Sequence, residues 1–125
     1  MINIHLKPSN VLNESLALRG VVNEIFETNK NILIMGDMNF DCKYMSGVKK
    51  QKVRDEFPEF TFYINDDIST TTSISLCALD RILISGDLMK NSVVSNSNQT
   101  YLYYKEFNMT LEEVIVNLYK YFIFL

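Results

Sequence analysis

The sequence lacks a strong net charge of either sign. Its 125 residues include 12 Lys and Arg against 15 Asp and Glu, which gives a formal charge of −3 at pH 7. General electrostatic binding to nucleic acid or to a membrane surface requires a strongly cationic surface, so the composition argues against such binding. It does not exclude enzymes that act on phosphate esters, because an acidic site can recruit the phosphate through a metal ion.

The sequence also lacks a secretory signal and a membrane span. Residues 1–5 have no basic start and no long apolar run. The longest apolar-rich stretch, residues 114–125, contains Asn117 and Lys120 and is too short to cross a bilayer. Two cysteines alone do not fix the redox compartment. We therefore expect no membrane partner, and the compartment stays open.

What is present is the composition of a folded domain. Hydrophobic residues make up 47% of the chain and aromatic residues 12%, which is enough for a globular core. The length allows one domain or a piece of a larger one. No repeat and no linker divides the chain, so residues 1–125 are treated as one unit.

Apolar spacing predicts a strand, a helix and a second strand at the start. Residues 1–5 form a short apolar strand, and apolar positions three and four apart indicate a helix from Pro8 to about Asn29. The continuous apolar run of residues 31–35 is typical of a strand buried on both faces. This order indicates a layered α/β or α+β architecture.

The rest of the chain predicts a mixture of short elements and polar loops. Thr110 and Glu113 have the spacing of a capping box, which starts a helix. The predicted elements are a weak helix at residues 47–57, strands at 59–64, 79–85 and 92–95, polar loops at 65–75 and 96–100, and a helix at 110–118.

Two polar residues directly follow the apolar run at residues 31–35. Asp37 could bind a hard cation or accept a proton, and Asn39 could donate to a phosphate oxygen. The alternative is that both side chains only cap a turn, and spacing alone favours this alternative.

Two further candidates are Asp80 and His5. Asp80 precedes Arg81 at the start of a buried strand, where it could orient a catalytic histidine or form a salt link at the strand end. His5 is the only histidine. For both, the structural alternative is favoured, and the case for a catalytic His5 strengthens only if Asp37 and Asp80 converge on it in the fold.

Two polar segments allow binding roles that the pattern does not decide. Cations at residues 43–54 could meet DNA phosphates, although a solvated surface of mixed charge is at least as consistent with the acidic residues that follow. Residues 65–75 are rich in oxygen ligands but lack the spacing of an EF-hand, so a plain polar loop is the default.

Taken in order and spacing, these segments resemble the deoxyribonuclease I family of the endonuclease/exonuclease/phosphatase superfamily. The likeness covers residues 1–107. Glycine, aspartate and asparagine in the G-D-x-N pattern alone indicate only the superfamily, whereas the two cysteines point to the deoxyribonuclease I branch. The matching segments are residues 4–9 (IHLKPS), 36–44 (GDMNFDCKY), 77–82 (CALDRI) and 92–94 (SVV).

The resemblance implies an α+β fold, namely the C-terminal half of a four-layered α/β/β/α sandwich. Residues 1–125 would form an incomplete domain in which residues 108–125 diverge from the family. The implied activity is metal-dependent endonucleolytic hydrolysis of DNA, with Mg²⁺ and Ca²⁺ as cofactors. Full-length members of the family are secreted, endomembrane or nuclear proteins.

The resemblance also assigns roles to the site residues. His5 would be one of two catalytic histidines, Asp37 and Asn39 would handle metal, water and phosphate with Asp37 as a magnesium ligand, and Asp80 would orient the second histidine. Cys42 and Cys77 would form a disulfide, which should stabilise the fold by roughly 3–4 kcal/mol. A calcium loop falls on Thr71, Ser73 and Ser75, with Ser69 where the family has an acidic ligand.

The sequence departs from the family at several positions of the site. The second histidine is replaced by Lys120 and a metal-binding aspartate by Tyr119. The family's N-terminal half, with its metal ligands and actin-binding surface, has no counterpart in these residues. We therefore expect a truncated, inactive form whose uncovered sheet face favours self-association. The alternatives are a non-catalytic relic or interaction module, and another phosphodiesterase of the superfamily.

Overall fold

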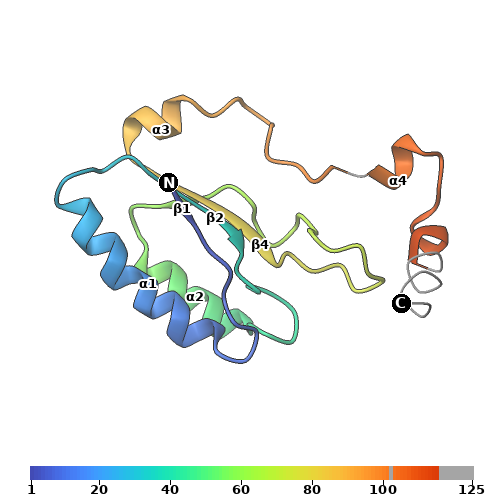
Figure 1. The fold of residues 1–125 in the computed structure, drawn as a ribbon, viewed down its shortest axis with the longest axis horizontal. Helices are drawn as coiled ribbons and strands as arrows, with labels where there is room; N and C mark the ends of the chain where they lie inside the picture. The colour runs from blue at the N-terminus through green and yellow to red at the C-terminus, as the bar shows by residue number, and fades with distance from the viewer. Residues whose placement is uncertain (102, 116–125) are drawn as a thin grey trace.

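The computed structural model describes residues 1–101 and 103–115. Helices and strands alternate at first, as the apolar spacing predicts, and Figure 1 shows their arrangement. The elements are β1 (Ile2–Asn3), α1 (Val11–Phe26), β2 (Ile32–Asp37), α2 (Gly47–Glu56), β3 (Thr61–Phe62), β4 (Asp80–Ser85), α3 (Asp87–Asn91) and α4 (Tyr103–Glu106).

The four strands form one mixed sheet in the order β1-β2-β4-β3. β1 runs parallel to β2 and is joined to it by α1, the usual crossover for parallel strands. β2 and β4 are antiparallel along their whole length, with Ile32 opposite Ser85 and Asp37 opposite Asp80. The ends of three neighbouring strands therefore meet at one end of the sheet.

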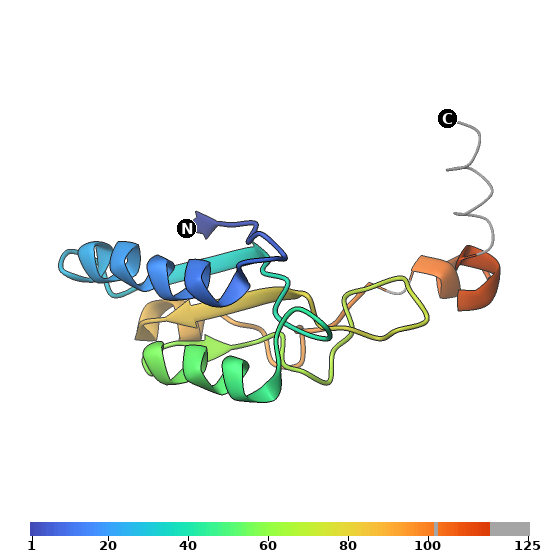
Figure 2. The same ribbon diagram turned by 90° about the horizontal axis from the view of Figure 1, so that it is seen from below.

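α1 and α2 lie next to each other against one face of this sheet, as Figure 2 shows. Alternate residues of β2 and β4 point to these helices and are fully buried, among them Ile34 and Leu83. The core between the layers is mostly apolar, and its apolar members include Leu18, Val22, Ile34, Phe40, Val53, Phe57 and Leu83. This layer of helices holds the sheet that carries the candidate site.

The opposite face of β2 does not match the prediction of a strand buried on both sides. Burial along the strand alternates, and Met35 is 36% exposed. Met35 pairs with Ile82 of β4, which is half-buried. The prediction is wrong in the described chain because α1 and α2 pack on the other face of β2.

Other predictions have mixed outcomes. The helix at 47–57 is confirmed as α2, the strand at 79–85 as β4 and the loop at 65–75 as irregular backbone. The strand at 59–64 is only two residues long, and residues 92–95 form no strand because a turn follows α3. The α+β class is confirmed by the mixed sheet and its helices.

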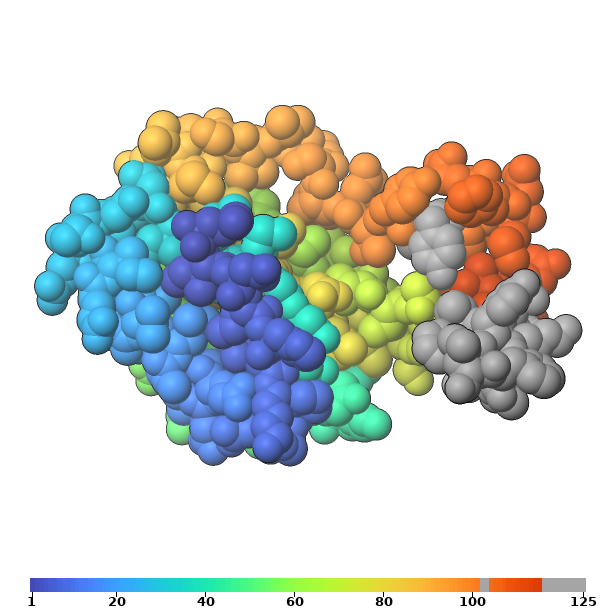
Figure 3. Space-filling view, in the orientation of Figure 1, coloured from blue at the N-terminus to red at the C-terminus, as the bar shows by residue number. Residues whose placement is uncertain are grey.

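The C-terminal part of the described chain extends away from the main body, as Figure 3 shows for residues 103–115. Residues 111–115 are helical, and the predicted capping box is present. The Thr110 N–H donates to Glu113 Oε2 (2.7 Å) and the Glu113 N–H donates to Thr110 Oγ1 (3.2 Å). The rest of the helix predicted at 110–118 lies outside the described residues. Among residues 1–101 and 103–115, no helix has both the length and the apolar character that crossing a bilayer requires.

Candidate active site at one end of the sheet

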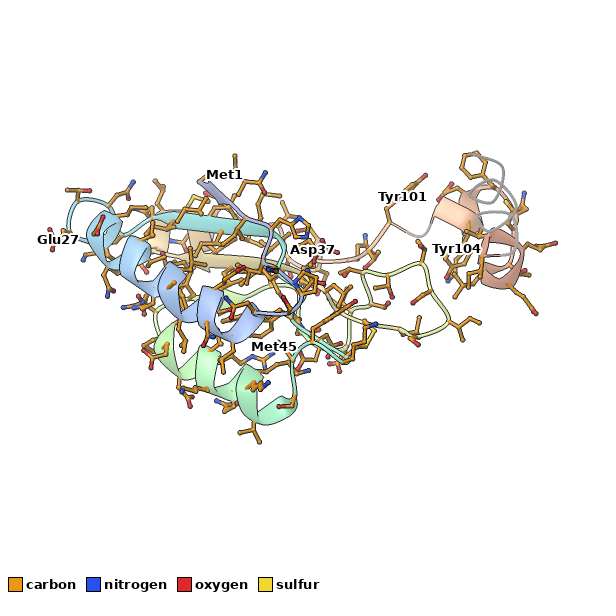
Figure 4. The ribbon with its side chains drawn as sticks, turned by 60° about the horizontal axis from the view of Figure 1, so that its bottom comes forward. Met1, Glu27, Asp37, Met45, Tyr101 and Tyr104 are labelled. Carbon is orange, nitrogen blue, oxygen red and sulfur yellow. A yellow bond between two sulfur atoms is a disulfide. The ribbon has the colours of Figure 1, made fainter. Side chains whose placement is uncertain are left out.

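The sheet brings His5, Asp37 and Asp80 to the same end. The hydrogen bonds of β1 to β2 continue past β1, because the Ile4 N–H donates to Met35 O and the Leu6 N–H donates to Asp37 O, both at 3.0 Å. His5 therefore lies beside the end of β2, and Asp80 lies opposite Asp37 on β4. Figure 4 shows Asp37 at the end of the sheet remote from Glu27.

His5 and Asp37 form a close and accessible pair. His5 Nε2 lies 3.6 Å from Asp37 Oδ2, and the two side chains are 71% and 40% exposed. The distance is within the range of electrostatic attraction and is too long for a hydrogen bond. An imidazole and a carboxylate held this way can be reached by a substrate, which is what proton transfer requires.

Gly36 makes this close approach possible. Its φ is 141°, a backbone conformation that other residues rarely adopt, and a Cβ atom at this position would collide with the carbonyl of Ile4. β1 can therefore lie against β2 only because residue 36 has no side chain. The glycine of the G-D-x-N segment thus serves to bring His5 beside Asp37.

Asn39 is placed differently from the expectation that it donates to a phosphate. The residue is 4% exposed, with a positive φ of 48°. Its Nδ2 donates to Leu6 O (2.9 Å), and its N–H donates to Asp37 Oδ1 (2.9 Å). Asn39 therefore fixes the Asp37 carboxylate and the chain that follows His5.

Asp80 is half-buried at the start of β4, and its backbone is held by a threonine. The N–H groups of Leu79 and Asp80 both donate to Thr70 Oγ1 at 3.0 Å. Arg81 does not form the strand-end salt link considered for Asp80, because its guanidinium pairs with Asp66. The histidine that Asp80 would orient falls at Lys120, which, like Tyr119, lies outside the described residues.

The disulfide between Cys42 and Cys77 is confirmed. Its Cα atoms are 5.8 Å apart, and the bridge joins segments 35 residues apart in sequence. Cys42 follows residues 37–40 (the Asp37 turn), and Cys77 precedes Asp80. The bridge therefore joins the loop that follows Asp37, at the end of β2, to the loop that precedes Asp80, at the start of β4.

The residues present do not form a complete metal site. Within the part of the chain that the structure describes, no three His, Cys, Asp or Glu side chains gather closely enough to hold a metal ion. In the predicted calcium loop, Thr71 Oγ1 and Ser73 Oγ both donate to Ser75 O, at 2.9 Å and 2.7 Å. These hydroxyl groups thus satisfy the loop's own backbone, and binding of Mg²⁺ or Ca²⁺ stays a prediction.

The sequence patterns did not predict a cluster of ion pairs next to the loops that flank Asp37 and Asp80. Asp66 binds Arg81 (2.7 Å), Arg54 (3.0 Å) and Lys50 (3.1 Å), and Lys50 also binds Asp41 (2.8 Å). The sequence predicted Lys50 and Arg54 as solvated or DNA-facing cations and Asp66 as part of a polar loop. The one available signal was a charged Arg81 inside an apolar strand, since a buried cation requires a partner.

The charges in this cluster shift the pKa of its acids. Partial burial raises the pKa of Asp66, but the hydrogen bonds from Arg54 and Lys50 outweigh burial and lower the pKa to about 2. Burial likewise raises the pKa of Asp41, but the hydrogen bonds from Lys50 and the Ala78 N–H outweigh burial and lower the pKa below its usual value. Both carboxylates are therefore ionised at neutral pH.

Comparison with known proteins identifies the family. No family model matches the chain. The chain is 32% identical to human deoxyribonuclease gamma over 120 residues, 33% identical to sheep deoxyribonuclease-1 over 101 and 29% identical to mouse deoxyribonuclease-1 over 113. The chain belongs to the deoxyribonuclease I family. These matches cover 92%, 78% and 88% of the chain but 39%, 38% and 40% of the relatives, so it spans about two fifths of their length.

Proposed function

We propose that this chain supplies the histidine–aspartate part of an active site that hydrolyses phosphodiester bonds in DNA. The observation that carries the proposal is the His5–Asp37 pair, 3.6 Å apart and open to solvent, with Asp80 directly opposite Asp37 in the sheet. DNA as substrate rests on the relatives, which are named deoxyribonuclease-1 and deoxyribonuclease gamma.

Each residue has a distinct task in this proposal. His5 exchanges a proton with the attacking water or the leaving oxygen, because an accessible imidazole is suited to general acid–base catalysis. Asp37 balances the charge of this imidazole while it carries the proton, because the carboxylate lies 3.6 Å away. Asp80 adds a second carboxylate at the same end of the sheet, where it can orient a further catalytic group. Asn39 holds Asp37 and the chain after His5 in place.

We further propose that a polypeptide of these 125 residues alone does not cleave DNA. Its described residues present one His–Asp pair and no group of three metal-binding side chains. Loss of a single general acid or base already lowers the rate about 10²–10⁴-fold. Divalent metal would add charge stabilisation once further ligands complete the site.

The disulfide supports an oxidising compartment. A bridge such as Cys42–Cys77 persists in secreted or endomembrane proteins and is rare in the cytosol. We propose this location in agreement with the expectation for full-length members of the family.

A two-part nicking assay tests the function. The first sample is the 125-residue polypeptide with supercoiled plasmid, magnesium and calcium, and we expect no nicking above the background. The second is a chimaera in which residues 1–107 replace the aligned segment of mouse deoxyribonuclease-1, and we expect nicking. Nicking by the polypeptide alone that disappears in Asp37→Ala would refute the inactive state. A folded but inactive chimaera would refute the proposed site.

A second candidate role, self-association through the sheet, is favoured by the exposure of Met35. This side chain is 36% exposed beside the half-buried Ile82, on the face that α1 and α2 do not cover. Apolar sheet faces are normally buried against another layer. A second copy of this chain would cover the face in the absence of another layer.

A further inference from the structure

The ion cluster of Asp41, Lys50, Arg54, Asp66 and Arg81 joins four segments of the chain. Asp41 follows the Asp37 turn, Lys50 and Arg54 lie on α2, Asp66 lies in the loop after β3 and Arg81 lies on β4. Three cationic side chains pair with two carboxylates, with nitrogen–oxygen distances of 2.7 to 3.1 Å. The cluster is therefore built from groups that are far apart in sequence.

Arg81 anchors the cluster in the core. Its side chain is fully buried, and its guanidinium donates to Ile64 O (2.8 Å), Phe40 O (3.2 Å) and Asp66 Oδ1 (2.7 Å). Phe40 directly follows Asn39, so the hydrogen bond from Arg81 to Phe40 O holds the last residue of the Asp37 turn. Asp66 supplies the charge that a buried guanidinium requires, because an unpaired buried cation is strongly destabilising.

Lys50 carries the connection to the second loop of the site. Its ammonium lies between Asp66 Oδ2 (3.1 Å) and Asp41 Oδ1 (2.8 Å), and it is only 12% exposed. The other oxygen of Asp41 accepts the N–H of Ala78 (2.9 Å), two residues before Asp80. The Met38 and Phe40 N–H groups complete the link by donating to Leu79 O at 3.2 Å and 3.3 Å.

We propose that Lys50 and Asp66 are positioning residues that hold the Asp37 turn and the start of β4 in the relative placement the active site needs. The proposal rests on the proposed function, since it assigns these residues to the same site. Neither residue touches the His5–Asp37 pair, and both act through Asp41, Ala78 and Arg81. The disulfide joins the loop after Asp37 to the loop before Asp80 covalently. The ion cluster fixes the orientation of these loops through its hydrogen bonds to Phe40 O and the Ala78 N–H.

The charged side chains of Lys50 and Asp66 indicate a role beyond filling space between α2 and the sheet. Apolar side chains would fill the space between α2 and the sheet with similar or better stability, because burying ions has a large desolvation penalty. A carboxylate and an ammonium instead impose directional bonds, and here those bonds end on the backbone of the two site loops. The ion cluster thus fixes the orientation of the two loops, which apolar packing alone would not do.

The test compares Lys50→Met with the matched control Lys49→Met on the same helix, where Lys49 is exposed. Amide hydrogen exchange and NMR spectra are recorded on the full chain. In Lys50→Met, the Ala78 amide should exchange about tenfold faster or more, since its charged acceptor is no longer held. The Asn39 amide and the imidazole of His5, the only histidine, should shift, while α1 amides keep their rates.

Asp66→Asn provides the second variant, and it should shift the same signals together with the Phe40 amide. If that variant fails to fold, Lys50→Met still decides, because the buried Arg81 keeps its partner Asp66 when Lys50 is replaced. Equal behaviour of Lys50→Met and Lys49→Met would overturn the proposal. Uniformly faster exchange throughout the chain would also overturn it, because that result indicates general stabilisation only. Neither readout needs catalysis, so the proposed function stands or falls separately in the nicking assay.

Discussion

At the scale of single residues, the site depends on how closely β1 approaches β2. Gly36 permits this approach because any Cβ would meet the Ile4 carbonyl. Asn39 then fastens the segment after His5 through Leu6 O. The sequence resemblance named the chemical residues, but it did not assign this positioning role to Gly36 or Asn39.

Replacement of Gly36 should therefore separate the two strands. We predict that Gly36→Ala destabilises the fold by about 1–3 kcal/mol, because it adds a collision to a strained backbone. The control is Gly20→Ala, where nothing lies within 4 Å of the added Cβ. In this helix position, alanine should stabilise by about 0.5–1 kcal/mol. Thermal unfolding measures both effects, and equal effects of the two variants would contradict the account of Gly36.

The lowered pKa of Asp66 predicts how stability depends on pH. The folded pKa of about 2 lies below the ordinary 3.8, so the stabilisation is fully present above about pH 4. It is lost as the pH falls from about 4 through 2, where the folded protein must also take up the proton. Urea unfolding at several pH values should show this loss in the wild type and a smaller loss in Asp66→Asn. The same pH dependence in both proteins would contradict the assigned ion pairs.

At the scale of elements, apolar patterns predicted those that are long or fully buried. α1, β2 and β4 each have a periodic or continuous apolar signal, and the structure confirms them. The strand expected at residues 92–95 is wrong: two valines between serines suit a strand, yet a turn follows α3 and these residues pair with none of the four strands of the sheet. Local preference does not form a strand without a partner.

The register of the sheet and the ion cluster could not be predicted from patterns. Both depend on contacts between residues far apart in sequence. Ile32 pairs with Ser85 in the sheet, and Arg81 contacts Asp66 and Phe40 O, which lie 15 and 41 residues away. The convergence of His5, Asp37 and Asp80 likewise follows from the strand order, which places β4 and not β3 beside β2.

The disulfide should matter most for the loops that it joins. We predict that Cys42→Ser together with Cys77→Ser lowers the free energy of unfolding by roughly 3–4 kcal/mol, because the unfolded chain loses a covalent restraint. Faster amide exchange should appear first around residues 69–78. Urea unfolding of the double variant beside the oxidised wild type checks this, and identical curves would show that the bridge contributes no stability.

At the scale of the whole molecule, the sheet face that α1 and α2 leave uncovered leads to a prediction about self-association. We predict that the chain self-associates, and that Met35→Glu weakens this association by placing charge on the face. Val48→Glu is the control, since Val48 is 84% exposed on α2 and remote from that face. Sedimentation velocity over a range of concentrations distinguishes them. A monomeric wild type with a cooperative melting transition would contradict this prediction.

The central claim is that His5 and Asp37 form the acid–base part of a phosphodiesterase site. The most direct measurement is the nicking rate of the mouse deoxyribonuclease-1 chimaera with Asp37→Asn, compared with Asp67→Asn at an exposed loop position. We predict that Asp37→Asn lowers the rate at least about 10²-fold, as expected for loss of a catalytic group, and that Asp67→Asn leaves it unchanged. An unchanged rate in Asp37→Asn would contradict the claim.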